Sequence, residues 1–242
     1  MYSVRGYAGV SPACIVQREM ETAGKRGGFF ASFEGPEGSG KSTQIHRLAA
    51  SLAEQGHAVW TTREPGGTRA GETIRPILLG PQAGPLSAWS EALLFTAARA
   101  QLVDEVIRPR LHRGELVLCD RYSDSTLAYQ GYGRGLDLET MRQLQAEATG
   151  GVTPDLTLLL DLPVEAGLAR IPRSAKDRLD RETIAFHQRV YAGYHEMAAR
   201  EPHRWRQVDA SRDPDEVAAI ILELTLEALR TAGIHPAERR SA

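Results

Sequence analysis

Short apolar segments alternate with longer amphipathic segments along most of this chain. Five apolar segments, at 29–34, 57–62, 115–120, 155–161 and 204–210, are predicted to be β-strands. Several of them are apolar without polar alternation, which is typical of strands buried on both faces. Segments 41–55, 87–107 and 213–232 instead repeat apolar residues every three or four positions, which predicts amphipathic helices. The alternation favours an α/β fold, in which helices cover both faces of a parallel sheet.

Glycine and proline positions set the expected ends of these helices. Gly56 follows the helix predicted over 41–55 and suits its end. Pro109 should end or kink the helix predicted over 87–107, because its ring removes a backbone donor and clashes with the preceding turn. Asp213 can cap the last helix, with Pro214 at its first position.

We expect one domain over residues 29–233, flanked by segments of different composition. Residues 1–28 show neither the strand pattern nor the helix pattern, and they lack the apolar core of a signal peptide. We therefore predict a disordered N-terminal extension. Residues 234–242 are predicted to be a flexible tail. An Arg-rich, helix-poor insertion at about 171–181 separates two helical patterns, and we interpret it as a mobile lid.

Composition narrows the possible partners. The chain has 29 Lys and Arg against 31 Asp and Glu, a formal net charge of −2. This balance gives no reason to expect a nucleic-acid or membrane partner. Of the two cysteines, Cys14 and Cys119, the latter ends an apolar strand and is expected to be a reduced, buried thiol, which fits a cytoplasmic protein.

A glycine-rich stretch, FFASFEGPEGSGKSTQ, follows the first predicted strand. Residues 35–42 fit G-x-x-x-x-G-K-[ST], with the helix that confirms this phosphate-binding motif directly after it. Lys41 should reach the β- and γ-phosphates, and Ser42 should ligate Mg²⁺. The predicted ATP-binding residues are Gly35, Pro36, Glu37, Gly38, Ser39, Gly40, Lys41, Ser42 and Thr43. The motif predicts a nucleoside triphosphate but not a reaction, since switches, motors and kinases share it.

Further stretches restrict the reaction. They are TREPGGT at 62–68, LLFTAARAQ at 93–101, CDRYSDSTLAYQGYGRG at 119–135 and the late VDASRDPDEV. In this order, over about residues 29–230, the chain resembles the bacterial thymidylate kinases. The resemblance implies a P-loop NTPase three-layer α/β/α fold with a five-stranded parallel sheet and an Arg-containing lid. It also implies transfer of the γ-phosphoryl of ATP to dTMP with Mg²⁺, and a homodimer formed through the 87–107 helix.

The resemblance also assigns roles to single residues. Arg63 and Arg121 should grip the acceptor phosphate, and Asp120 should support Mg²⁺ together with Ser42, through a metal-bound water. Lid arginines should stabilise the transferring phosphoryl, and we favour Arg173 and Arg178. Ala210–Arg212 are expected near adenine. The predicted catalytic set is therefore Lys41, Arg63, Asp120, Arg121, Arg173 and Arg178.

The acceptor nucleotide is assigned in the same way. Phe95 should stack on the pyrimidine, while Arg99 donates to a base carbonyl where cytosine carries an amino group. Tyr129 should crowd a ribose 2′ position, and Glu37 is expected near the 3′-hydroxyl. The predicted dTMP-binding residues are Glu37, Arg63, Phe95, Arg99, Arg121, Ser125, Thr126, Tyr129 and Gln130.

Plainer interpretations remain open at this stage. Arg63 can form a surface ion pair with Glu64, Phe95 can be a core residue, and Arg99 can be a solvated helix residue. At the level of activity, the alternatives are another nucleoside monophosphate or deoxynucleoside kinase, or a P-loop switch. A nucleoside kinase would need a base for a 5′-hydroxyl, and a GTP-dependent switch would carry an N-K-x-D motif, which is not seen.

Overall fold

The computed structural model describes residues 27–80 and 83–236. Its centre is a five-stranded, all-parallel sheet in the order β2-β3-β1-β4-β5. The strands are β1 (Phe29–Glu34), β2 (Val59–Arg63), β3 (Leu116–Asp120), β4 (Leu156–Asp161) and β5 (Trp205–Asp209). All five lie within two residues of the predicted segments, and the predicted parallel sheet is confirmed.

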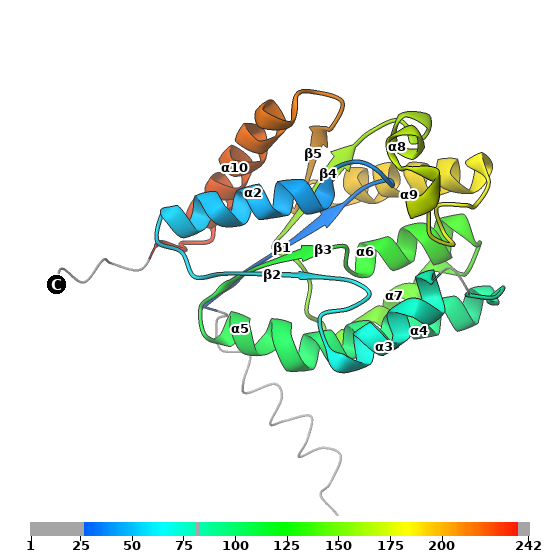
Figure 1. Ribbon diagram of the computed structural model, residues 1–242. Coiled ribbons are helices and arrows are strands. Elements are labelled where there is room, and N and C mark those ends of the chain that lie inside the picture. Colours follow the sequence, from blue (N-terminus) through cyan, green and yellow to red (C-terminus); the bar gives the residue numbers. More distant parts are fainter. Residues whose placement is uncertain (1–26, 81–82, 237–242) are drawn as a thin grey trace, which may run out of the picture.

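Helices cover both faces of the sheet (Figure 1). Helices α2 (Lys41–Glu54) and α10 (Pro214–Thr231) pack on one face, against inward side chains of β1 such as Phe29 and Phe33. Phe30, which points the opposite way, packs with the helices of the other face. That face carries α3 (Arg69–Leu79), α4 (Ala88–Leu102), a π-helical turn η1 (Val103–Ile107), α5 (Arg108–His112), α7 (Leu138–Thr149) and α9 (Ile184–Arg200). The three-layer fold is therefore confirmed.

The shorter elements gather near the carboxyl ends of the strands. They are α6 (Ser123–Thr126) and the π-helical η2 (Leu127–Gly133) after β3, then α8 (Val164–Arg170) and the 3₁₀ turn η3 (Arg173–Ala175) after β4. The register pairs Asp120 of β3 with both Phe33 of β1 and Arg63 of β2, so these three strands end level. The strand order reverses beside β1, and open parallel sheets bind ligands at such a point.

The predicted helix over 87–107 differs from the structure at its end. The chain stays helical to His112, past Pro109, but residues 103–107 form a π-helical turn instead of an α-helical one. The wider turn accommodates Pro109, which cannot donate a backbone hydrogen bond and whose ring crowds the carbonyl four residues earlier.

The chain ends are only partly described. Predictions for residues 1–26 and 237–242 lie outside the described residues. Ile234, expected in the flexible tail, packs against the core cluster beneath α10, and its N–H donates to the Leu229 carbonyl. Within the described ranges, no helix has both the length and the apolarity needed to cross a bilayer.

Candidate active site

The glycine-rich loop between β1 and α2 has the geometry that phosphate binding requires. Gly35 and Gly38 have φ values of 135° and 71°, which favour glycine. A Cβ atom on Gly38 would lie 2.1 Å from the Gly167 carbonyl oxygen of α8, so no larger residue fits. Helix α2 then begins after Gly40, whose lack of a side chain leaves the first backbone N–H groups open to an anion.

Lys41 lies within this loop and is almost fully buried. Its Nζ donates to the carbonyl oxygens of Pro36, at 2.9 Å, and Gly35, at 3.2 Å. Burial, together with the charge of Arg121, lowers the pKa of Lys41 to about 8. The ammonium is thus held in a weakly solvated site, where an added phosphate charge would stabilise it.

Two oxygen ligands meet beside the loop. The Ser42 hydroxyl donates to Asp120 Oδ2 at 2.6 Å, although 78 residues separate them in the sequence. Hydroxyl and carboxylate oxygens suit Mg²⁺, which binds few protein ligands and keeps water and substrate phosphates in its shell. The described residues contain no cluster of three or more His, Cys, Asp or Glu arranged to hold a metal.

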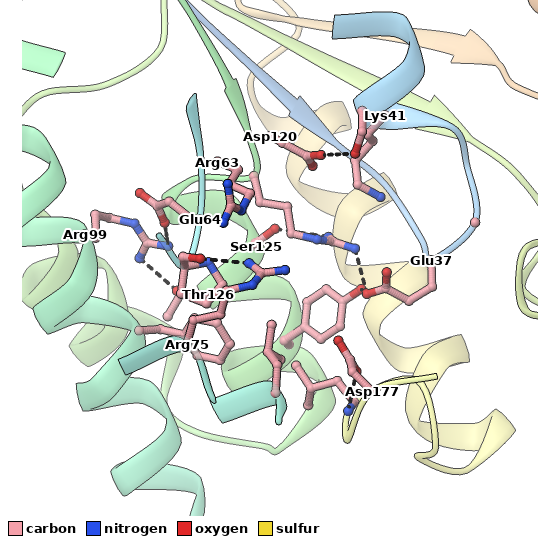
Figure 2. A pocket seen from close by; sticks show the side chains of 18 of the residues that line it. Glu37, Lys41, Arg63, Glu64, Arg75, Arg99, Asp120, Ser125, Thr126 and Asp177 are labelled. Atoms are coloured by element: carbon pink, nitrogen blue, oxygen red, sulfur yellow. Dashed lines mark hydrogen bonds and ion pairs between the residues drawn. The ribbon is translucent and has the colours of Figure 1, made fainter. Parts of the chain in front are cut away.

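A cavity of about 360 Å³ opens in front of the loop. Figure 2 shows side chains from the loop, from the β2–α3 connection, from α4 and from α6 pointing into it. It brings together every predicted dTMP-binding residue and much of the P-loop: Glu37, Gly38, Gly40, Lys41, Ser42, Thr43, Arg63, Phe95, Arg99, Asp120, Arg121, Ser125, Thr126, Tyr129 and Gln130. Of the other predicted residues, Gly35, Pro36, Ser39, Arg173 and Arg178 lie outside this lining.

Arg121 and Glu37 form an ion pair at the centre of the cavity wall. Arg121 Nη2 lies 2.7 Å from Glu37 Oε1, and the Tyr129 hydroxyl donates to the same oxygen at 2.6 Å. Burial disfavours the Glu37 charge, but the charges of Arg121 and Lys41 outweigh it and lower the pKa of Glu37 to about 2. Arg121 has φ 69°, an uncommon value for a residue with a side chain, of the kind found at functional sites.

Two further arginines come from the β2–α3 region. Arg63 is half-exposed and pairs with Glu72 of α3, where its Nη2 lies 3.0 Å from both carboxylate oxygens. The interpretation of Arg63 as the ion-pair partner of Glu64 is therefore wrong. Arg75 of α3 lines the cavity and donates to the Pro65 carbonyl at 2.8 Å. Sequence analysis missed Arg75, although its place on the helix after TREPGGT was a usable signal.

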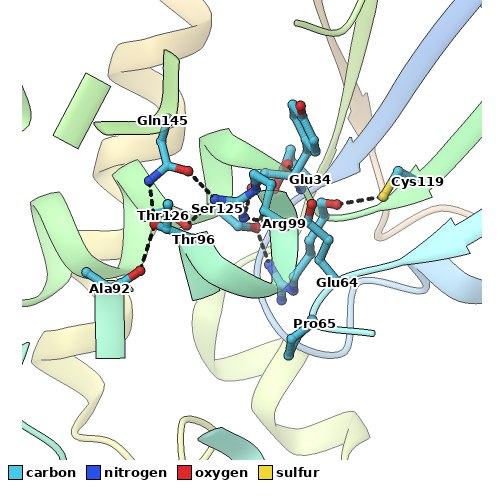
Figure 3. A network of polar contacts seen from close by, with 12 residues as sticks. Glu34, Glu64, Pro65, Ala92, Thr96, Arg99, Cys119, Ser125, Thr126 and Gln145 are labelled. Atoms are coloured by element: carbon cyan, nitrogen blue, oxygen red, sulfur yellow. Dashed lines mark hydrogen bonds and ion pairs between the residues drawn. The ribbon is translucent and has the colours of Figure 1, made fainter. Parts of the chain in front are cut away.

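Arg99 is buried in a network of acceptors, so the interpretation of a solvated helix residue is wrong. Its Nη2 pairs with Glu64 and donates to the Tyr122 carbonyl, and its Nη1 donates to the side-chain oxygens of Thr126 and Gln145 (Figure 3). Only the buried Nε lacks a partner among the described residues. Phe95, one turn earlier on α4, is half-buried and lines the cavity.

The two favoured lid arginines do not reach the cavity. Arg178 points to α3 and α4, where its Nε donates to the Leu78 carbonyl at 2.8 Å and its Nη2 lies 2.5 Å from Glu91. Glu91 is fully buried and needs positive partners, which explains this orientation. Arg173 is exposed on η3. The lid instead contributes Asp177 and Leu179 to the lining, so catalytic roles for Arg173 and Arg178 stay predictions.

The parallel sheet, its strand order and the glycine-rich loop define a P-loop NTPase fold, and the cavity beside the loop is also lined by arginines. A family model described as Thymidylate kinase matches residues 33–221. Two similar relatives are the thymidylate kinases of Thermomicrobium roseum, 56% identical over 84% of this chain and 96% of the relative, and of Deinococcus radiodurans, 53% identical over 80% and 94%.

A solved structure agrees with these relatives. The crystal structure of thymidylate kinase from Ehrlichia chaffeensis aligns with a TM-score of 0.66 at 34% identity, covering 82% of this chain and 98% of that chain. The chain therefore belongs to the thymidylate kinase family. Its activity is that of the family, the phosphorylation of dTMP to dTDP with ATP.

Proposed function

We propose that the cavity in front of the P-loop is where this reaction takes place. The single observation that supports this most strongly is that one cavity is lined both by the P-loop and by Phe95 and Arg99, with Lys41 and Arg99 on opposite sides of it (Figure 2). Triphosphate and acceptor nucleotide would then meet end to end between them. The acceptor phosphate would lie among Arg63, Arg75 and Arg121, whose guanidinium groups match phosphate oxygens.

The reaction we propose is a direct in-line transfer. A 5′-phosphate oxygen of dTMP forms a bond to the γ-phosphorus while the bond between that phosphorus and the β–γ bridging oxygen breaks, releasing ADP. The attacking oxygen is already ionised near neutral pH, so no strong general base is required. Lys41 would exchange the Gly35 and Pro36 carbonyls for phosphate oxygens. Ser42 and Asp120 would hold Mg²⁺, which neutralises charge on the phosphates.

Orientation of Gln130 supports a preference for thymine over cytosine. Gln130 Nε2 donates to Glu91 Oε1 at 2.8 Å. Burial alone would raise the pKa of Glu91, but hydrogen bonds from Arg134, Gln130 and Arg178 outweigh burial and lower this pKa. An ionised carboxylate only accepts hydrogen bonds, so the amide nitrogen of Gln130 must face it. The amide oxygen is left for the cavity, where it suits the N3–H donor of thymine and not the N3 acceptor of cytosine.

We also propose a homodimer formed through α4. Trp89 and Leu93 lie one turn apart on α4 and are 44% and 51% exposed, and Ile77 of the neighbouring α3 is 48% exposed. Large apolar side chains exposed on two neighbouring helices suit a two-fold interface, in which each copy buries the same residues. A Leu93→Asp variant should sediment as a monomer, whereas a wild type that sediments as a monomer would refute the proposal. The buried free thiol of Cys119 suits the cytoplasm, the compartment we expect.

The test of the proposed site is an ADP-release assay with ATP and Mg²⁺ across dTMP, dUMP, dCMP and thymidine, on wild type and on Arg121→Met. Wild type should act on dTMP and dUMP and discriminate strongly against dCMP and thymidine. Arg121→Met should raise the KM for dTMP much more than the KM for ATP. Equal use of dCMP, or an unchanged dTMP KM in the variant, would contradict the assignment.

A further inference from the structure

Glu34 is a fully buried acid that the proposed reaction does not use. It is the last residue of β1 and lies directly beneath the P-loop, outside the cavity lining. Its Oε1 accepts the Tyr122 backbone N–H at 2.8 Å. Its Oε2 accepts from the Ser125 hydroxyl at 2.6 Å and from the Tyr194 hydroxyl at 3.1 Å. Two segments distant in sequence, one around Tyr122 and Ser125 and the other on α9, therefore converge on one carboxylate.

The same two hydroxyl groups also face Arg121. Arg121 Nη1 lies 3.0 Å from the Tyr194 hydroxyl and 3.3 Å from the Ser125 hydroxyl, and the two hydroxyl oxygens are 2.9 Å apart. A guanidinium only donates hydrogen bonds, so both oxygens must turn lone pairs toward it. Each hydroxyl has a single hydrogen, and that hydrogen must point elsewhere.

Above its pKa, which burial raises to about 7, the Glu34 carboxylate is ionised and is the group that receives these hydrogens. Ser125 donates to Oε2 of Glu34. Tyr194 donates either to Oε2 directly or to the Ser125 oxygen, which in turn donates to Oε2. In both arrangements neither hydrogen points at Arg121. The carboxylate thereby fixes the direction of a short chain of hydrogen bonds that ends on the guanidinium.

We infer that Glu34 is a positioning residue for the kinase reaction, which sets the Ser125 and Tyr194 hydroxyls as acceptors and so holds the Arg121 guanidinium in place for the acceptor phosphate. This inference rests on the proposed role of Arg121. Glu34 itself would touch neither substrate.

The Glu34→Gln variant tests the direction of these hydrogen bonds, because it keeps size and shape. The Tyr122 N–H still needs an acceptor, so the introduced amide oxygen takes the place of Oε1 and the NH₂ group faces the two hydroxyls. Ser125 and Tyr194 must then accept hydrogen bonds from this NH₂ group. Because one hydroxyl can still donate to the other, at least one hydroxyl hydrogen must turn toward Arg121. Since the substitution removes a buried charge, the variant is expected to fold.

Steady-state kinetics and thermal melts of the full chain provide the readout. For Glu34→Gln we expect kcat/KM for dTMP to fall about 10- to 100-fold, the range for losing a hydrogen bond to a charged group. The KM for ATP should change less than about threefold. Tyr194→Phe removes one acceptor of the Arg121 guanidinium and should also lower kcat/KM for dTMP. The matched control is Thr225→Val on α10, which removes a buried hydroxyl bonded to the Ile221 carbonyl and should leave both KM values unchanged.

A double variant separates positioning from general damage. If Glu34 acts through Arg121, adding Glu34→Gln to Arg121→Met should lower kcat/KM for dTMP less than about threefold further. Equal losses for dTMP and ATP, an unchanged dTMP parameter, or full additivity with Arg121→Met would each overturn the inference. An Arg121→Met variant with a normal dTMP KM would instead refute the proposed role of Arg121, so the two failures are distinguishable.

Discussion

Replacing Arg99 by Met tests the buried ion pair behind the base end of the cavity. The side chains of Arg99 and Glu64 are 1% and 3% exposed, and they form a direct ion pair. Burial raises the pKa of Glu64, and the charge of Arg99 only partly offsets this effect. Met matches the length of the Arg stem, so the substitution removes the charge without leaving a large cavity.

The expected loss of stability is large because the Glu64 charge stays buried without its partner. Removing one partner of a buried pair costs about 3–5 kcal/mol, a substantial part of a total stability of about 5–15 kcal/mol. For a chain of this size the melting temperature should fall by about 6–20 °C. Without Arg99 the pKa of Glu64 in the folded protein rises further above its unfolded value. The stability of the variant should therefore be greatest at low pH and decrease as pH rises from the unfolded pKa through that folded value.

Urea unfolding followed by circular dichroism at pH 6 and pH 8 measures this effect. The double variant Arg99→Met, Glu64→Leu should recover at least half of the loss, because no unpaired charge remains. A loss below about 1 kcal/mol in the single variant, or a double variant no more stable than the single one, would refute the argument. Binding of dTMP should weaken more than binding of ATP in both variants if Arg99 lines the acceptor end, as we propose.

Three other variants test separate parts of the site. Lys41→Met should lower kcat by about 10²–10³-fold in the ADP-release assay, as for loss of one preorganised charge; near-normal kcat would remove Lys41 from catalysis. Glu37→Gln should lower the free energy of unfolding by at most about 3 kcal/mol at pH 7, because the pKa of Glu37 is about 2. The difference in stability between wild type and variant should become smaller as pH falls below 4.5. A difference in urea titrations that does not change with pH would contradict this argument. Arg178→Ala should lower stability by about 1–3 kcal/mol with little change in kcat, because Arg178 serves Glu91; a kcat loss above about 100-fold would place it in the reaction instead.

Much of the fold could be predicted because its signals are local. The three central strands, β1, β3 and β4, appear as buried and mostly apolar segments, and Gly35 to Ser42 identify the turn after β1. The carboxyl ends of parallel strands meet at one edge, so Arg63 and Asp120 could be placed beside the P-loop without coordinates. The π-helical turn before Pro109 could not be predicted, because it is one of several ways a helix can accommodate a proline.

The part of the site that sequence analysis missed lies behind the cavity wall. The sequence shows Glu34 only as the end of a predicted strand and gives Tyr194 no role, because nothing local indicates that these residues, 160 positions apart, are in contact. The family resemblance predicts Arg178 near the transferring phosphoryl, and nothing local in the sequence indicates its ion-pair partner in this structure. Its partner, Glu91, lies on α4, 87 residues earlier.

Three buried acids around this cavity each hold a side chain that lines it. Glu34 acts on Arg121 through two hydroxyls, Glu64 holds Arg99 directly, and Glu91 holds the Gln130 amide. Burying a carboxylate is unfavourable, and burial raises the pKa values of Glu34 and Glu64, so these acids weaken the fold more than apolar residues would. Their effect is instead to fix donors and acceptors before substrate arrives, so little reorganisation is needed when charge moves. A chain selected for stability alone would not place acids there, and this cost is itself evidence that the cavity wall serves the reaction.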